Sequence, residues 1–170
     1  MIFRAPTPEK QLTGLAILDQ TRLHEAENFL HEQIPLSHAM GLRVLPAGDD
    51  GFAVEAPVAL NYNHLQTAFG GSINAVATLA GYALLWLELR GLPAHVVISA
   101  SSIRFLRPIR KTIRAVCESP SAPRLEALRA SLQETGKAKI HLQVRVEEHS
   151  IIAAHFEATF VALLPGKGGL

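Results

Sequence analysis

The sequence predicts a single α+β domain in which a curved antiparallel sheet of five to six strands wraps around one long central helix. Three observations indicate this fold class. The segment from about Gly71 to Leu89 is apolar on nearly every side, so a helix there must be enclosed by other parts of the protein. Segments that read as strands lie on both sides of it. The repeated strand–helix alternation that a doubly wound fold needs is absent.

The composition fits one enclosed core. A chain of 170 residues is long enough for one domain and short for two. Hydrophobic residues make up 48% and charged residues 18%, which argues against disorder and suggests that a partner subunit covers some apolar surface. Sixteen basic and fifteen acidic residues give a net charge of +1, so charge does not point to a nucleic-acid partner. The lone Cys117 cannot form an intramolecular disulfide, and we expect a buried structural thiol.

The hydrophobic pattern predicts no membrane span. The first ten residues lack the uninterrupted apolar core of a secretory signal. The most apolar stretch, Ile73 to Leu89, is slightly short for a bilayer and is interrupted by Asn74 and Thr78. We therefore expect a soluble cytoplasmic protein.

Before the central helix, the sequence predicts an arm, a helix and a hairpin. Pro6 and Pro8 indicate a loosely held arm over residues 1–18, ahead of a domain over 19–165 and a flexible tail over 166–170. The expected elements are a helix over Asp19–Gln33, a hairpin of strands Met40–Leu45 and Phe52–Val58, and a polar loop over Asn61–Ala68.

After the central helix, most of the sequence reads as strand. Gly91-Leu92-Pro93 ends the helix. The run Lys139 to Glu147 alternates between apolar and polar residues, as a strand with one buried face does. The expected elements are strands over His95–Leu106, Thr112–Glu118, Lys139–Glu147 and Ile151–Leu164, with a short amphipathic helix introduced by Pro120 and Pro123.

Two motifs carry a resemblance to a known family. Asn61-Tyr62-Asn63-His64-Leu65-Gln66-Thr67-Ala68-Phe69-Gly70-Gly71-Ser72 joins the polar loop to the central helix, and Ile103-Arg104-Phe105-Leu106-Arg107-Pro108 ends a strand in a turn. In this order they resemble the hotdog thioesterase superfamily, in which a Gly-Gly pair opens the central helix. More closely, they are similar to a family of predicted thioesterase domains sometimes fused behind an acetyltransferase domain. The resemblance covers about Leu23 to Leu164. It implies a hotdog fold, acyl-thioester hydrolysis and a homodimer or higher homo-oligomer.

The paired glycines suit the chemistry of thioester hydrolysis. The first N–H groups of a helix have no partner within it, and the macrodipole makes that end partly positive. Glycines allow a substrate carbonyl to approach closely. Water attack on a thioester develops an oxyanion, which the amides of Gly70 and Gly71 could stabilise. The structural alternative is that glycine is needed there only for tight helix–sheet packing.

The resemblance also implies a water site, with one departure. Asn63 falls seven residues before Gly70, where related acyl-CoA thioesterases carry an Asn that helps to position the attacking water. They usually carry a carboxylate eight residues after that glycine, as base or nucleophile, and this sequence has Thr78 there. No Asp or Glu lies between Glu55 and Glu88. The usual base is therefore missing.

His64 is the expected substitute for that base. An imidazole exchanges protons near neutral pH and could deprotonate a water held by Asn61 or Asn63. A loop histidine with one structural hydrogen bond is the alternative. Thr78 and Ser72 could hydrogen-bond the water or the acyl carbonyl, although both are also ordinary structural choices in a helix.

Further substrate contacts are predicted around the junction and the following strand. Phe69 adjoins the glycines, and Ser99 and Ser101 lie on a strand that often crosses the dimer interface in this superfamily. Five cations surround one turn: Arg104, Arg107, Arg110, Lys111 and Arg114. They form either a solvated hairpin end or a dock for the phosphates of coenzyme A or a carrier protein's pantetheine arm, with Arg104 and Arg107 as the expected contacts.

Three functions remain open at this point. The leading one is hydrolysis of an acyl-CoA or acyl-carrier-protein thioester. The missing helix carboxylate motivates a second, a non-catalytic acyl-CoA-binding protein. The third is a hotdog dehydratase or hydratase that uses His64. No metal or separate cofactor is expected, because the histidines lack metal-site spacing and coenzyme A or pantetheine would arrive as part of the substrate.

Overall fold

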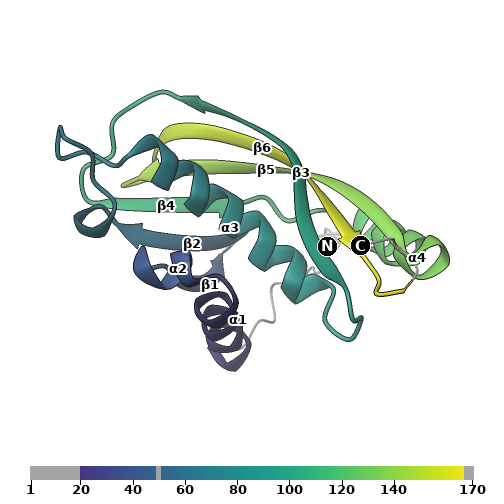
Figure 1. Cartoon of the computed structure of the whole chain (residues 1–170). Coiled ribbons are helices and arrows are strands. Elements are labelled where there is room, and N and C mark those ends of the chain that lie inside the picture. The colour runs from purple at the N-terminus through teal and green to yellow at the C-terminus, as the bar shows by residue number, and fades with distance from the viewer. Residues whose placement is uncertain (1–19, 49–50, 167–170) are drawn as a thin grey trace, which may run out of the picture.

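A computed structural model describes residues 20–48 and 51–166, so the predicted arm over 1–18 and most of the predicted tail lie outside the described residues. In this part of the chain, six antiparallel strands form one sheet in the order β1-β2-β4-β5-β6-β3 (Figure 1). The strands are β1 Arg43–Gly48, β2 Gly51–Pro57, β3 His95–Phe105, β4 Thr112–Cys117, β5 Lys137–Glu148 and β6 Ile151–Leu163. The sheet and its central helix confirm the predicted α+β fold class.

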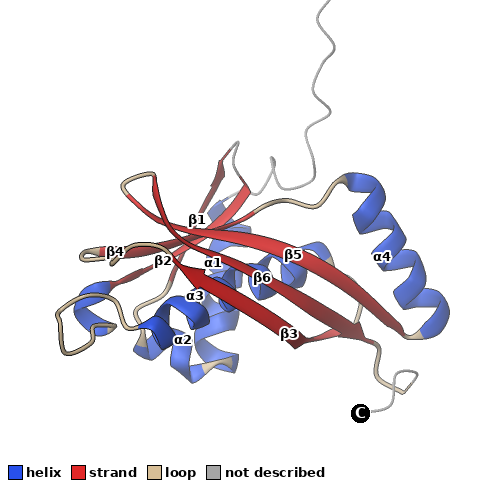
Figure 2. Cartoon of the chain, turned by 90° about the horizontal axis from the view of Figure 1, so that it is seen from above, coloured by secondary structure: helices blue, strands red, loops and turns tan. Residues whose placement is uncertain are grey.

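The central helix α3 (Gly70–Glu88) crosses one face of the sheet and packs against β2, β3, β4, β5 and β6 (Figures 1 and 2). Ten of its 19 residues are buried. The helix passes so close to the sheet that a Cβ at Gly81 would lie 2.8 Å from the ring of Phe160. Its length and apolar composition would also suit a membrane span, and the enclosing sheet accounts for them.

Two helices that precede the sheet cover the start of the core. In α1 (Gln20–Gln33), Leu23, Ala26 and Leu30 are buried, and Phe29 stacks on Trp86 of α3 with ring centroids 4.5 Å apart. A short helix, α2 (Pro35–Ala39), follows and is not evident from the sequence. It forms because proline suits the first turn of a helix, where its missing N–H costs no hydrogen bond. The first strand consequently begins later than the predicted Met40.

The last helix, α4 (Ala122–Thr135), lies at the end of the sheet where β5 begins (Figure 2). Its buried face is formed by Leu125, Leu128 and Leu132, in agreement with the predicted amphipathic helix. Arg129 donates hydrogen bonds to the backbone carbonyl and, at 2.9 Å, to the carboxylate of Glu88, the last residue of α3. These contacts fix the C-terminal end of the central helix.

Strand β3 forms one edge of the sheet and pairs with β6. Within the described residues its outer edge has no partner strand. Val97, Ile98 and Phe105 are large apolar side chains on this strand that are 41–50% exposed. A long edge strand that exposes large apolar side chains is an unusual feature for a monomer, because its free N–H and C=O groups invite pairing with another chain.

Candidate functional site

Three segments that are far apart in the sequence meet at the start of α3. They are the loop over residues 61–69, the first turn of α3, and the turn over residues 106–111 between β3 and β4 (Figure 1). Ala68 donates its N–H to the carbonyl of Ile109 at 2.8 Å, and the Ile109 side chain is fully buried. The loop, the helix start and the basic turn therefore form one connected region.

The first amides of α3 are open donors. Phe69 is the N-cap residue and makes no capping hydrogen bond with its side chain. Ile73 donates its N–H to the carbonyl of Phe69 at 3.0 Å, whereas the N–H groups of Gly70 and Gly71 meet no acceptor within the described part of the chain. These donors lie at the positive end of the helix dipole. They can donate hydrogen bonds to an oxygen atom on which negative charge develops.

Two aromatic rings flank these amides. The Phe105 ring lies against Gly70, where an added Cβ would be 3.4 Å from its Cζ, and a Cβ at Gly71 would collide with the Phe69 ring. Phe69 is 56% exposed and Phe105 50% exposed. The rings place apolar surface beside polar donors. Such surroundings strengthen an electrostatic interaction relative to water.

The side chain of Asn63 folds the loop. Its Oδ1 accepts the N–H groups of Leu65 and Thr67 at 2.9 and 3.2 Å, and its Nδ2 donates to the Thr67 hydroxyl at 3.1 Å. This is an Asx-type turn, in which a short polar side chain replaces a backbone acceptor. The second proton of Nδ2 is not used in these bonds and can still hold a water. The neighbouring His64 is exposed on the same loop, and no described residue hydrogen-bonds its imidazole.

Asn61 has a different place from the one expected. Its side chain is 4% exposed, and its NH2 group donates to the carbonyls of Met40 and Pro57 at 2.9 and 2.8 Å. Both of its amide protons are thus committed to the backbone. The backbone carbonyl of Asn61 accepts a hydrogen bond from the N–H of Phe69 at 2.8 Å. In this geometry Asn61 holds the loop against the backbone of neighbouring segments, whereas the sequence predicted a contact with water or substrate.

The two polar helix positions are separated along α3. The Thr78 hydroxyl donates to the carbonyl of Asn74 at 2.9 Å, which is the usual back-bond of a helical threonine. Thr78 lies eight residues beyond Gly70, or about 12 Å along the axis at 1.5 Å per residue. Ser72 is half-buried in the first turn and lies next to the open amides. Within one chain, the structure brings Ser72 and not Thr78 to the glycine pair.

The predicted residues of β3 do not face one way. Ser99 lies where the pairing of β3 with β6 shifts register, and its hydroxyl donates to the carbonyl of Thr159 at 3.1 Å. Ser101 pairs with the buried Ala158, so it faces the side of the sheet that carries α3. Arg104 lies on the opposite face, because side chains alternate along a strand. Within one chain these three side chains are therefore not brought together, and their predicted substrate contacts stay a prediction.

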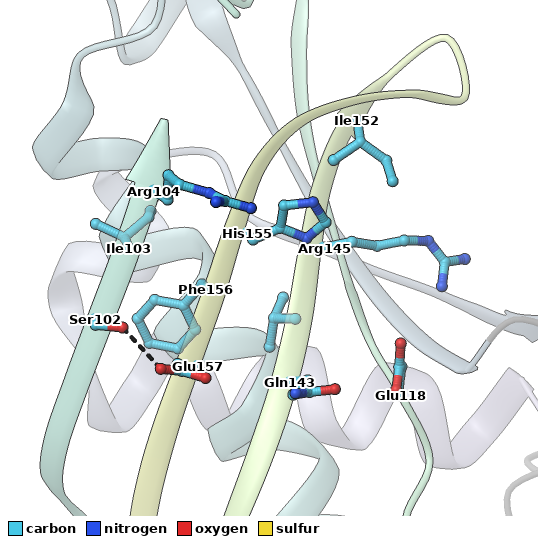
Figure 3. A pocket seen from close by; sticks show the side chains of 11 residues that line it. Ser102, Ile103, Arg104, Glu118, Gln143, Arg145, Ile152, His155, Phe156 and Glu157 are labelled. Carbon is cyan, nitrogen blue, oxygen red and sulfur yellow. Dashed lines mark hydrogen bonds between the residues drawn. The ribbon is translucent and has the colours of Figure 1, made fainter. Parts of the chain in front are cut away.

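Arg104 belongs instead to a hollow of about 560 Å³ on the outer face of the sheet. Figure 3 shows Arg104 beside His155, with Arg145 on the next strand. Glu118 and Glu157 line the same hollow, and the Ser102 hydroxyl donates to Glu157 at 3.1 Å. No residue of the helix start lines it. Within one chain, Arg104 is therefore not brought to the glycine pair, and its predicted contact with phosphate stays a prediction.

The other cations of the predicted dock divide into two groups. Arg114 forms an ion pair with the buried carboxylate of Glu147. Arg107, Arg110 and Lys111 are exposed on the turn beside the loop. This second group lies on the turn that binds the loop through the N–H of Ala68 and the carbonyl of Ile109.

A carboxylate that the sequence did not indicate holds this turn. Glu148, at the end of β5, accepts backbone N–H groups from Arg110, Lys111 and Thr112. Burial acts to raise the pKa of Glu148, but these three N–H groups and the charge of His149 outweigh it and lower the pKa. Phe105 was also not singled out as a site residue. Glu148 contacts residues 36–38 positions away, and Phe105 contacts Gly70, which is also distant in sequence, so neither contact leaves a local pattern from which the role could be recognised.

The comparisons with known proteins agree with this fold. A family model described as "Putative thioesterase (yiiD_Cterm)" matches residues 23–164. A solved structure described as the putative thioesterase from Shewanella oneidensis has 28% sequence identity and a TM-score of 0.78, over 86% of this chain and 100% of that chain. A protein of unknown function from Chlorobaculum tepidum has 25% identity and a TM-score of 0.79, over 86% and 96%. A Pseudomonas aeruginosa protein described as a probable thioesterase has 24% identity and a TM-score of 0.69, over 82% and 94%, which shows the fold alone.

Proposed function

We propose that this chain hydrolyses acyl thioesters at the start of α3. The chain belongs to the putative thioesterase family (yiiD_Cterm), whose model spans residues 23–164. That membership supports a thioesterase-type protein with the hotdog fold. The observation that carries the proposed site is the pair of open amides at Gly70 and Gly71 between two half-exposed aromatic rings.

In the proposed reaction, a water oxygen attacks the thioester carbonyl carbon, and the carbonyl oxygen becomes an oxyanion. The amides of Gly70 and Gly71 would donate to that oxyanion, while Phe69 and Phe105 keep apolar surface around it. The C–S bond then breaks, and the products are the carboxylic acid and the free thiol. In hydrolases, removing one oxyanion donor lowers kcat by roughly 10²–10³-fold.

The attacking water would be held on the loop. Asn63 has one Nδ2 proton outside its internal hydrogen bonds, and this proton can donate to the water oxygen. His64 follows it on the exposed loop and would accept the proton that the water loses. The same imidazole could then protonate the departing thiolate.

The carrier of the acyl group would be coenzyme A or an acyl carrier protein. Both present phosphate on a pantetheine arm, and Arg and Lys side chains bind phosphate well. Arg107, Arg110 and Lys111 are exposed at the end of the molecule where the amides lie. We place the phosphate contacts on this turn.

A second copy of the chain would complete the assembly. The free edge of β3 and its exposed Ile98 and Phe105 favour pairing of β3 with a partner's β3, in a soluble cytoplasmic homodimer. Light scattering after size exclusion measures the mass directly. Ile98→Lys should convert a dimer to a monomer, and a wild-type monomer at micromolar concentration would contradict this assembly.

Non-catalytic acyl-CoA binding remains a second candidate, favoured by one set of observations. The Thr78 hydroxyl is bonded to the helix backbone, most of the Asn63 amide is used by the loop, and no carboxylate occurs between Glu55 and Glu88. This function predicts calorimetric binding of acyl-CoA without release of thiol.

A thiol-release assay over acyl-CoA chain lengths separates the two candidates. We expect cleavage of at least one thioester, with His64→Ala slower by about 100-fold or more. His24→Ala is the matched control, because His24 is also an exposed histidine but lies on α1, which contributes no residue to the proposed site. Binding without cleavage would leave only the second candidate, and unchanged turnover in His64→Ala would remove the imidazole from the mechanism.

A further inference from the structure

We infer that Glu148 is a positioning residue for the start of α3 and acts through two peptide groups of the turn between β3 and β4. Its effect on catalysis rests on the proposed function, whereas its effect on the loop does not. Glu148 is the last residue of β5, on a different element from every residue of the site. It contacts neither the glycine pair nor the loop directly in the bonds described below.

The Glu148 carboxylate binds one side of the turn. Its Oε1 accepts the N–H groups of Arg110, Lys111 and Thr112 at 3.0, 2.6 and 3.3 Å, and its Oε2 lies 3.3 Å from the Arg110 nitrogen. Pro108 interrupts regular structure here, so these N–H groups need an acceptor from elsewhere. Hydrogen bonds to an ionised carboxylate are stronger than those between neutral groups.

The same peptide groups bind the loop on their other side. The carbonyl of Ile109, which shares a peptide group with the Arg110 N–H, accepts the N–H of Ala68 at 2.8 Å. The carbonyl of Lys111, which shares a peptide group with the Thr112 N–H, accepts the N–H of Val58 at 2.8 Å. A charged acceptor at the N–H polarises a peptide group and makes its carbonyl a better acceptor.

The segment over residues 58–69, which contains the loop, is thus tied near both ends to one carboxylate. Val58 begins the short 3-10 helix η2 (Val58–Leu60) that leads into the loop, and Ala68 lies two residues before Gly70. Asn63 and His64 lie between these two anchors. An ionised Glu148 therefore sets the position of the water-binding loop and of the first amides of α3.

Amide hydrogen exchange tests the relay without any substrate. In Glu148→Gln, which keeps the side-chain shape and removes the charge, exchange of the Ala68 and Val58 amides should be about tenfold faster. Glu126→Gln is the control, since Glu126 is exposed on α4 and loses the same charge. Unchanged exchange at Ala68 and Val58, with faster exchange at Arg110 to Thr112, would overturn the relay.

A pH titration of the wild-type protein by NMR gives an answer even if Glu148→Gln does not fold. The Ala68 and Val58 amide resonances should move with the same midpoint as the Glu148 carboxyl, below the ordinary glutamate range. A different midpoint would overturn the inference. The other charged or titratable groups around Glu148 are Arg110, Lys111, His149, Glu55, Arg114, Arg145 and Glu147, and the side-chain resonances of the glutamates and of His149 are recorded in the same experiment, so that a shift caused by one of them is recognised.

Kinetics then tests the catalytic part. We expect Glu148→Gln to lower kcat about tenfold and to change KM for an acyl-CoA by less than threefold, because misplaced oxyanion donors act in the transition state. A raised KM with unchanged kcat would mean that Glu148 positions the phosphate-binding cations of the turn. That result would contradict a role in positioning the amides of Gly70 and Gly71. If the wild-type protein cleaves no thioester, the proposed function fails, and the exchange experiment still decides the relay.

Discussion

Gly71 and Gly81, two of the α3 glycines that face aromatic rings, should respond in opposite ways to the same substitution. At Gly81, a Cβ would lie 2.8 Å from both Cε2 and Cζ of Phe160, whose ring is 1% exposed and held in the core. At Gly71, the colliding atoms belong to the half-exposed Phe69 ring, which can rotate into solvent. Replacing a helical glycine by alanine otherwise stabilises a helix by about 1 kcal/mol.

These terms give a sign for each variant. Overpacking a core costs about 1–3 kcal/mol, so Gly81→Ala should lower the free energy of unfolding by up to about 2 kcal/mol after the gain in helix propensity. Gly71→Ala should be neutral or more stable by up to about 1 kcal/mol, because the Phe69 ring moves at little cost. The difference between the two variants comes from the freedom of the neighbouring ring alone.

Urea denaturation followed by circular dichroism measures both changes, provided that the m-values stay equal. A double-mutant cycle of Gly81→Ala with Phe160→Leu isolates the contact, since a smaller side chain relieves the clash. We expect a favourable coupling of about 1 kcal/mol. If Gly81→Ala stabilises the protein as much as Gly71→Ala does, the close helix–sheet approach at Gly81 is incorrect.

Three further predictions follow. Gly71→Ala should lower kcat at least about tenfold while leaving stability intact, because the added Cβ displaces the Phe69 ring beside the oxyanion donors; full activity would contradict that placement. Burial raises the pKa of Glu88, and the charge and hydrogen bond of Arg129 offset only part of this rise. Because the folded pKa is higher than the unfolded one, the stability that Glu88 contributes is present below its unfolded pKa and lost as pH rises through its folded pKa. Arg129→Ala removes the lowering contribution and should cost about 1–2 kcal/mol at pH 7 and less at pH 4, by denaturation at both pH values. Burial, and secondarily the charge of Glu118, raises the pKa of Cys117 to about 12, so a disulfide reagent at pH 8 should label this thiol only after unfolding.

The elements of the fold were predictable because their signals are local. Alternation over Lys139–Glu147 predicted a strand that the structure extends to Lys137–Glu148, and the all-round apolar run predicted the central helix within one residue at each end. The order of strands in the sheet has no comparable signal. It depends on pairing between distant segments, as in the contact of β3 with β6.

The candidate site was predictable only where one segment builds it. The glycine pair lies at the helix start, where the sequence placed it. Arg104 was grouped with Arg107 in one predicted phosphate dock because the two are neighbours in sequence, but strand alternation and the position of α3 decide which face it occupies. Asn61 and Asn63 look alike in the sequence as polar loop residues. In the structure, the buried Asn61 uses both amide protons to hold the loop, whereas Asn63 keeps one Nδ2 proton outside its internal hydrogen bonds. Glu148 could not be found, because its partners lie 36–38 residues away.

The most direct test of the account follows the backbone amides of Gly70 and Gly71 by NMR. The ligand is an acyl-CoA analogue in which a methylene replaces the thioester sulfur, so the carbonyl remains and cannot be hydrolysed. We expect saturable downfield shifts of both amide protons, larger than those of the outer-face residues Arg104 and His155. Binding that leaves the two glycine amides unchanged, or that perturbs only the outer face, would contradict the placement of the acyl carbonyl at the start of α3.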